Sequence, residues 1–247
     1  MLMGDINLYE SPALRKITLP VIRPGGFELT ARGLALCRLA PGDRVLDVGC
    51  GTGAVVDYLR QQNGLAAMGL DASSVLLEDG ARAYGGLPLV RGRAEQLPMI
   101  DGCVGAVLCE CVLSLCPDPL QVLGEMRRVL MPGGYLVLTD VYARERRTGK
   151  GTGRTSVHCC LHGAVDRTTT QDRIAAAGFD LMLWEDHSAR LKQLAAELIW
   201  SYGSLDAFWT AVAGRDVATA PCGSGAGGSG RPGYYLLVAR KKRSARL

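Results

Sequence analysis

Short apolar runs alternate with amphipathic stretches along the middle of the chain, from about residue 43 to residue 185. The apolar runs predict seven strands, at residues 44–48, 66–70, 87–91, 104–109, 134–140, 179–185 and 234–240. Helices are expected between them. Strands that alternate with helices form a parallel sheet with helices on both faces, and the pattern therefore predicts an α/β fold.

Two of the connecting helices have readable ends. The first is predicted over residues 119–130, where apolar side chains share one face and the sequence Pro132-Gly133-Gly134 stops the helix. The second is predicted over residues 169–177, with a threonine as its N-cap and Gly178 at its end. Both helices follow a predicted strand, as the alternating pattern requires.

Two segments lie outside this alternation. Residues 1–40 contain a short helical stretch introduced by Arg23-Pro24-Gly25-Gly26, and residues 188–213 carry apolar residues at helical spacing before a glycine-rich loop at 221–233. The second segment fits a packed helix with a connector, or else a cover over an active site. We expect a single domain over residues 1–247, with residues 1–40 as a substrate or lid segment and residues 188–233 as an insertion before the last strand.

Composition supports a folded chain. The 247 residues are 48% hydrophobic and 21% charged, which is enough apolar surface for a sizeable core. No uninterrupted apolar run approaches the roughly 18 residues that span a bilayer, and Asp5 and Glu10 interrupt the start of the chain. We expect a soluble, cytoplasmic protein with neither a signal peptide nor a membrane helix.

The net charge and the cysteine content indicate whether the protein is expected to bind nucleic acid or metal ions. The net charge of +4 includes five basic residues at the end of the chain, without which it is −1: Arg240, Lys241, Lys242, Arg243 and Arg246. A solvated basic end explains this charge, so nucleic acid is not an expected partner. Nine cysteines without a secretory signal indicate reduced thiols, and no Cys-x-x-Cys pair provides a zinc site, so no metal is expected.

The stretch with the clearest chemistry joins the first strand to the helix that follows it. It reads Asp47-Val48-Gly49-Cys50-Gly51-Thr52-Gly53. Glycines are needed where the chain turns tightly out of a sheet and a ligand approaches the backbone, and the helix start offers free N–H donors. The second strand ends in Asp71, and a carboxylate at that edge can accept hydrogen bonds from both hydroxyls of a ribose. The two features predict that a nucleoside binds there.

The identity of the nucleoside depends on further residues. Gly49, Gly51 and Ala54 also satisfy the looser G-x-G-x-x-A fingerprint of NAD-binding proteins. Against NAD stand Asp47, two residues before the first glycine, and a third glycine at Gly53. The later sequence Met-Pro-Gly-Gly-Tyr-Leu-Val-Leu at residues 131–138 also argues against NAD.

Together with residues 92–98 and 116–119, this ordered set resembles the class I S-adenosylmethionine-dependent methyltransferases. The resemblance covers about residues 40–185 and the final strand. It implies a Rossmann-like, seven-stranded, mostly parallel sheet with an antiparallel last strand. It also implies S-adenosylmethionine as cofactor, S-adenosylhomocysteine as product, and methyl transfer to a small-molecule acceptor.

The family's pattern implies the following cofactor-binding residues: Asp47, Gly49, Cys50, Gly51, Thr52, Gly53, Asp71, Ala72, Arg93, Ala94, Glu95, Cys109 and Glu110. Residues 49–53 would cradle the methionine part of the cofactor, Asp47 its amino group, and Asp71 the ribose. Residues 94 and 95 would flank adenine, and residues 109 and 110 would border the sulfonium. Many relatives carry Asp in place of Arg93, so Glu95 or the backbone would bind adenine N6 here.

The acceptor side has a second, local resemblance. The sequence His158-Cys159-Cys160-Leu161-His162-Gly163-Ala164 resembles the Cys-x-x-Gly-Ala segment of arsenite methyltransferases, whose cysteine binds trivalent arsenic. Cys160 matches that cysteine, so we expect it in the acceptor cavity opposite Cys109 and Glu110. Val56 stands where that family has a second cysteine, and Cys222 aligns only loosely as another thiol. Arsenite is therefore an alternative to a different small acceptor, and we expect it to be a poor substrate.

The same cluster is a weaker candidate for a metal site, because four potential ligands within five residues cannot all reach one ion with ordinary geometry. No catalytic residue is assigned outright, and the candidates are Glu110, Cys160 and His187. His187 follows Glu185 and Asp186 at a predicted strand end, where the three residues form either a general base or a salt-linked turn.

A group of basic residues follows the fifth predicted strand: Arg144, Arg146, Arg147, Lys150 and Arg154. They form either a solvated loop or a site that recruits an anionic acceptor. Methyl transfer depends mostly on positioning, so the lack of an obvious base does not exclude catalysis. The rival interpretations are a non-catalytic S-adenosylmethionine-binding module, which Arg93 favours, and an NAD-dependent oxidoreductase.

Overall fold

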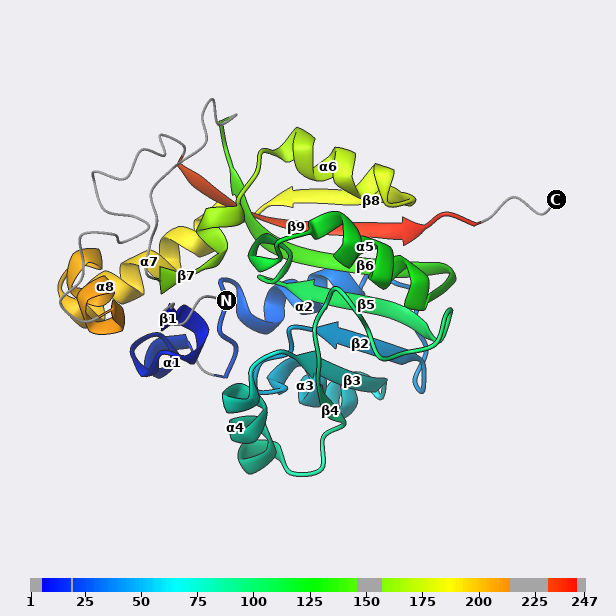
Figure 1. Cartoon of the computed structure of the whole chain (residues 1–247), viewed down its shortest axis with the longest axis horizontal. Helices are drawn as coiled ribbons and strands as arrows, with labels where there is room; N and C mark the ends of the chain where they lie inside the picture. The colour runs from blue at the N-terminus through cyan, green and yellow to red at the C-terminus, as the bar shows by residue number, and fades with distance from the viewer. Residues whose placement is uncertain (1–5, 19, 146–156, 214–230, 244–247) are drawn as a thin grey trace.

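The computed structural model describes residues 6–18, 20–145, 157–213 and 231–243, which form a central sheet covered by helices (Figure 1). The sheet has seven strands in the order β4-β3-β2-β5-β6-β9-β8. Their bounds are β2 Arg44–Val48, β3 Ala66–Asp71, β4 Leu89–Arg91, β5 Val104–Glu110, β6 Leu130–Ala143, β8 Phe179–Asp186 and β9 Pro232–Lys241. The strands from β4 to β6 are parallel, and β9 is antiparallel to both of its neighbours. The predicted fold class, with its antiparallel last strand, is confirmed.

Helices cover both faces of this sheet. One face is covered by α2 Gly26–Leu34 and α3 Ala54–Asn63. The other face is covered by α5 Pro119–Val129 and α6 Arg167–Ala176. A further helix, α4 Ser74–Tyr84, lies beside α3 near β4. Successive strand residues point to opposite faces, so Val107 and Leu108 of β5 belong to two different apolar clusters. The nearly continuous apolar runs of the central strands therefore supply both cores.

The ends of α5 and α6 differ from expectation in two details. α5 ends at Val129 and β6 begins at the next residue, so Pro132-Gly133-Gly134 lies within β6, where its pairing with β5 shifts register. Asp166, and no threonine, caps α6: its carboxylate accepts a hydrogen bond from the N–H of Thr169 at 3.0 Å. The predicted threonine cap is wrong because the aspartate three residues earlier provides a charged acceptor for that N–H.

A further layer lies at the carboxyl ends of the parallel strands (Figure 1). Its elements are β1 Ile6–Asn7, η1 Leu8–Glu10, α1 Pro12–Thr18, β7 Val157–His158, η3 Cys160–Gly163, α7 Ser188–Tyr202 and α8 Leu205–Ala213. β1 pairs in parallel with β7, and an apolar cluster that includes Leu14, Phe208 and Trp209 joins α1 to α8. The segment at 188–213, predicted as helical, is therefore two helices packed with the N-terminal segment.

Part of the basic end belongs to the sheet. Arg240 and Lys241 lie in β9, and Nε of Arg240 donates a hydrogen bond to the carbonyl of Gly133 at 2.9 Å. Residues 221–230 of the glycine-rich stretch and Arg246 lie outside the described residues. No helix within the described parts of the chain combines the length and apolar character needed to cross a bilayer.

Candidate functional site

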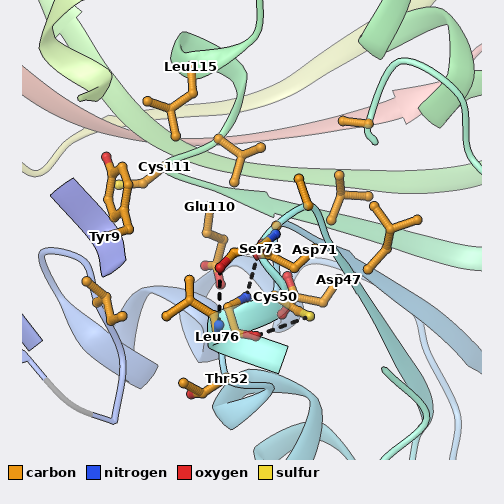
Figure 2. Close-up of a pocket in the computed structure, with 18 of the residues that line it drawn as sticks. Tyr9, Asp47, Cys50, Thr52, Asp71, Ser73, Leu76, Glu110, Cys111 and Leu115 are labelled. Carbon is orange, nitrogen blue, oxygen red and sulfur yellow. Dashed lines mark hydrogen bonds between the residues drawn. The ribbon is translucent and has the colours of Figure 1, made fainter. Parts of the chain in front are cut away.

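A cavity of about 580 Å³ opens where β2, β3 and β5 end, at the carboxyl edge of the sheet. It is lined by the loop between β2 and α3 and by the residues that follow β3, β4 and β5. The N-terminal segment contributes Asn7, Tyr9, Glu10 and residues 20–23 to the lining. Figure 2 shows Tyr9 on this side of the cavity. Ligands of α/β sheets bind at this edge, which makes the cavity the candidate site.

The glycine loop has the backbone conformation that its sequence predicts. Gly49, Gly51 and Gly53 have φ angles of +77°, +55° and +82°, in the left-handed region that favours glycine. A Cβ on Gly49 would lie 2.1 Å from the side chain of Val112, so the protein itself excludes a side chain there. A Cβ on Gly51 would meet only Leu76, at 4.0 Å, and both residues line the cavity. Gly51 therefore leaves free the space that a ligand needs beside the backbone.

Asp71 ties the end of β3 to the glycine loop. Its Oδ2 accepts a hydrogen bond from the N–H of Gly51, and its Oδ1 accepts one from the N–H of Ser73, both at 2.8 Å. Burial raises the pKa of Asp71, and these two backbone hydrogen bonds oppose the rise. Each carboxylate oxygen has a second lone pair, so Asp71 offers acceptors to hydroxyl groups of a ligand in the cavity.

Asp47 lies in β2 beneath the glycine loop and is 3% exposed. It lines the cavity close to Glu110 and Asp71. Burial raises the pKa of Asp47 well above its usual range, the carboxylate of Glu110 raises it further, and Arg23 opposes the rise. A buried carboxyl group in this setting is stabilised in its charged form by a cationic ligand.

Glu110, at the end of β5, is paired with Arg23 of the N-terminal segment. Nη2 of Arg23 lies 2.8 Å from Oε2 of Glu110, and each side chain is 4% exposed. Arg23 also donates to the carbonyl of Gly26 at 2.7 Å and contacts the hydroxyl of Thr30. Burial raises the pKa of Glu110, while Arg23 and Thr30 lower it. The sequence analysis missed Arg23 as a site residue, although an arginine directly before the Pro-Gly-Gly sequence was visible.

The residues expected at the adenine end also line the cavity: Ala72, Arg93, Ala94 and Glu95. Nη2 of Arg93 lies 3.1 Å from Oε1 of Glu95, and the Arg93 side chain is 70% exposed. Arg93 therefore reaches solvent at the rim and engages the carboxylate that the sequence analysis assigned to adenine.

Cys109, which the sequence analysis placed at the sulfonium, is not among the residues that line the cavity. It is 1% exposed and packs in the core between the sheet and α5. Neighbouring residues of a strand point to opposite faces, and the side chain of Cys109 lies on the α5 side of the sheet. Cys111 lines the cavity instead; its φ is +58°, and its Sγ lies 3.1 Å from Oη of Tyr234.

Cys160 also lies elsewhere than expected. η3, which begins at Cys160, packs against η2 Leu113–Leu115. The half-buried Cys160 packs in the same cluster as Cys111, and its thiol interacts with both Cys111 and Tyr9. Tyr9 and Cys111 line the cavity (Figure 2), whereas Cys160 is not part of the lining. Cys160 therefore lies directly behind two residues of the cavity wall, and its role toward an acceptor stays a prediction.

His187 belongs to a structural ion-pair network. Its Nε2 lies 3.0 Å from Oε2 of Glu185, whose Oε1 accepts from Nη2 of Arg32 at 2.6 Å. The network joins α2 to the end of β8 and is not part of the cavity lining. These contacts match the alternative of a linked turn at the strand end, and in this structure His187 lies outside the candidate cavity.

Arg144 pairs with Asp186 at 3.3 Å. The other residues named for the acceptor side, Arg146, Arg147, Lys150, Arg154 and Cys222, lie outside the described residues. Within the described ranges, no three metal-ligating side chains converge on one point.

The central part of the chain matches a known domain family. Residues 46–138 match a model described as a methyltransferase domain. An arsenite methyltransferase of Aquipseudomonas alcaligenes is 33% identical over 153 residues, which cover 55% of this chain and 43% of that protein. The chain spans less than half the length of this relative and of other curated relatives that it matches.

Solved structures share the fold over most of the chain. The cyclase SpnF is 25% identical, with a TM-score of 0.66 over 87% of this chain and 81% of that chain. Phosphoethanolamine N-methyltransferase 2 of Haemonchus contortus, in complex with S-adenosyl-L-methionine, has a TM-score of 0.72 and 17% identity. That similarity covers 94% of this chain and 56% of the other.

Proposed function

We propose that this chain, whose residues 46–138 belong to the S-adenosylmethionine-dependent methyltransferases, transfers a methyl group from S-adenosylmethionine to a small-molecule acceptor. The observation that carries the proposal is the cavity in which the glycine loop, Asp71 and Glu110 meet. Its place at the carboxyl edge of the sheet suits a nucleoside ligand. The matched domain family and the methyltransferase relatives support methyl transfer as the reaction.

The residues present fit this cofactor. Gly51 leaves space beside the backbone, Asp71 offers acceptor oxygens for hydroxyl groups, and the buried carboxylate of Asp47 suits an ammonium group. We assign residues 49–53 and Asp47 to the methionine part of the cofactor. We assign Asp71 and Ala72 to the ribose, and residues 93–95 to adenine.

When bound, S-adenosylmethionine supplies an electrophilic methyl group on a positively charged sulfur. The chain's own contribution is to bind, to orient and to exclude water. The N-terminal segment lines one side of the cavity and is held there by the Arg23–Glu110 ion pair and by its apolar contacts with α8. Correct orientation of two reactants can account for roughly 7 to 11 kcal/mol of a barrier, so the lack of a dedicated base does not exclude catalysis.

We assign the acceptor to the end of the cavity lined by Tyr9, Cys111 and Val112. Burial raises the pKa of Tyr9, and contact with Cys160 together with burial raises the pKa of Cys111, so both groups keep their protons at neutral pH. They serve as hydrogen-bonding groups and not as bases. The acceptor must then bring an atom that is nucleophilic at neutral pH, such as a neutral amine or a thiolate. In this proposal the N-terminal segment, which lines the cavity, holds the acceptor, and the helices over residues 188–213 support that segment by packing against it.

Arsenite is the second candidate acceptor. The observation in its favour is the position of two cysteines. Cys111 lines the acceptor end of the cavity, and Cys160 packs directly behind it. Against it stands Val56, a fully buried core residue at the position where the arsenite enzymes carry a thiol. A different small acceptor therefore remains the main proposal.

The test supplies the protein with methyl-labelled S-adenosylmethionine and fractionated small-molecule extracts. Formation of S-adenosylhomocysteine together with one labelled product supports the proposal, and the Gly51→Val variant should give neither. Binding of S-adenosylmethionine without turnover on any fraction would favour a non-catalytic binding module. A parallel titration with NAD tests the oxidoreductase alternative, which predicts tighter binding of NAD than of S-adenosylmethionine.

A further inference from the structure

The charges around the methionine end of the cavity are unevenly distributed. Asp47 and Glu110 are both buried there, at the ends of β2 and β5. Among the described residues that line the cavity, the cations are Arg23 and Arg93, and Arg93 is largely exposed and paired with Glu95. Arg23 is therefore the buried cation of this site.

Arg23 is held rigidly but is not saturated. Its guanidinium donates to the carbonyl of Gly26, to the hydroxyl of Thr30 and to the carboxylate of Glu110. A guanidinium carries five N–H groups, so two remain for a ligand. Both N–H groups of Nη2 are taken by Thr30 and Glu110, so the free donors are the N–H of Nε and one N–H of Nη1. These two do not form a parallel pair, and a ligand carboxylate would accept a single charge-assisted hydrogen bond from an arginine that is already held in place.

The charge balance points to the same kind of ligand. With both carboxylates ionised, Asp47, Glu110 and Arg23 carry a net charge of −1. The amino-acid part of S-adenosylmethionine has an ammonium, a carboxylate and a sulfonium, and therefore a net charge of +1. Such a ligand neutralises the buried site while giving each of its charged groups a partner of opposite sign.

We propose that Arg23 binds the carboxylate of the cofactor's amino-acid group, and that Glu110 holds Arg23 in position for this contact. The inference rests on the proposed cofactor. It assigns a binding role to a residue outside the matched domain, which begins at residue 46. Because Arg23 belongs to the N-terminal segment, cofactor binding and the packing of that segment along the cavity stabilise each other.

The test compares two ligands that differ in the amino-acid group alone. S-adenosylhomocysteine carries the group, and 5′-methylthioadenosine has the same adenosine and thioether without it. Calorimetric Kd values for both ligands give a selectivity ratio for each variant. In the wild type, S-adenosylhomocysteine should bind more tightly. In Arg23→Gln the ratio should fall about tenfold or more, while the Kd of 5′-methylthioadenosine should change by less than about threefold.

The double variant Arg23→Gln/Glu110→Gln distinguishes two roles of Arg23: binding the carboxylate of the ligand, and neutralising the carboxylate of Glu110. It does so because it leaves no unpaired carboxylate at position 110. The ratio should remain low in this double variant. Arg32→Gln is the matched control, since Arg32 forms an ion pair with Glu185 from the same part of the chain but outside the cavity. Its ratio should equal that of the wild type.

An unchanged ratio in Arg23→Gln would overturn the inference. So would a ratio restored in the double variant, because Arg23 would then serve only as the counterion of Glu110. Loss of 5′-methylthioadenosine binding in both variants would overturn it as well, since Arg23 would then be needed for the cavity itself. If the wild type bound neither ligand, the proposed cofactor would be wrong, which is a different failure.

Discussion

The carboxylate of Asp71, the last residue of β3, accepts a hydrogen bond at 2.8 Å from the backbone N–H of Gly51 in the loop between β2 and α3. One side chain therefore sets the position of the glycine loop and also presents acceptor oxygens to the cavity. A change at Asp71 affects both features, and a change at Gly51 affects the loop alone.

Asp71→Ala should weaken S-adenosylmethionine binding by about 1.5 to 3 kcal/mol, because charge-assisted hydrogen bonds to hydroxyl groups have this magnitude. Asp71→Asn keeps an acceptor for the N–H of Gly51 and should lose less. Calorimetry measures both affinities, with circular dichroism to confirm folding. Wild-type affinity in a folded Asp71→Ala protein would remove Asp71 from the cofactor site.

Gly51→Val should abolish S-adenosylmethionine binding while the sheet remains folded, because a β-branched side chain would occupy the open space beside the loop. Gly86→Val is the control, since Gly86 has a φ of +73°, open surroundings and no place in the cavity lining. Both substitutions strain the backbone, but Gly86→Val should bind the cofactor. Equal affinities in the two variants would mean that the glycine loop does not contact the ligand.

Arsenite should be a poor methyl acceptor, because Cys160 lies behind the cavity wall and Val56 does not replace a thiolate. The measurement is methyl transfer to arsenite by the wild type and by Cys160→Ser, with Cys103→Ser as a control outside the cavity. Rapid wild-type turnover that disappears in Cys160→Ser and persists in Cys103→Ser would make arsenite the preferred acceptor.

Asp140 should make stability depend on pH. It is buried, and burial raises its pKa to about 6 despite hydrogen bonds from Ser114. A carboxyl group with an unfolded-state pKa near 3.9 that holds its proton more tightly in the folded state stabilises the fold most below about pH 4. That contribution is lost as the pH rises through about 6.

Relative to Asp140→Asn, the wild type should therefore lose about 2 to 3 kcal/mol of unfolding free energy between pH 4 and pH 7. Urea unfolding at several pH values measures the difference. A pH-independent difference between the wild type and Asp140→Asn would contradict the prediction.

The sequence by itself determined the seven strands of the main sheet, the class of that sheet and the glycine loop with Asp71 at its edge. These features follow from local rules: apolar runs specify buried strands, left-handed turns need glycine, and parallel strands bring their carboxyl ends to one edge. The resemblance to a methyltransferase family rested on such local sequences in a fixed order. The domain match over residues 46–138 agrees with it.

The tertiary structure alone decided which distant residues complete the cavity. Arg23 and Glu110 are 87 positions apart, and their ion pair depends on how the N-terminal segment packs beside α2 and against α7 and α8. The same packing places Cys160 behind Cys111 and Tyr9. The alternation of side chains along β5 directs Cys109 into the core. Local periodicity carries no information on such long-range packing, because the apolar contacts that fix it come from segments far apart in the chain.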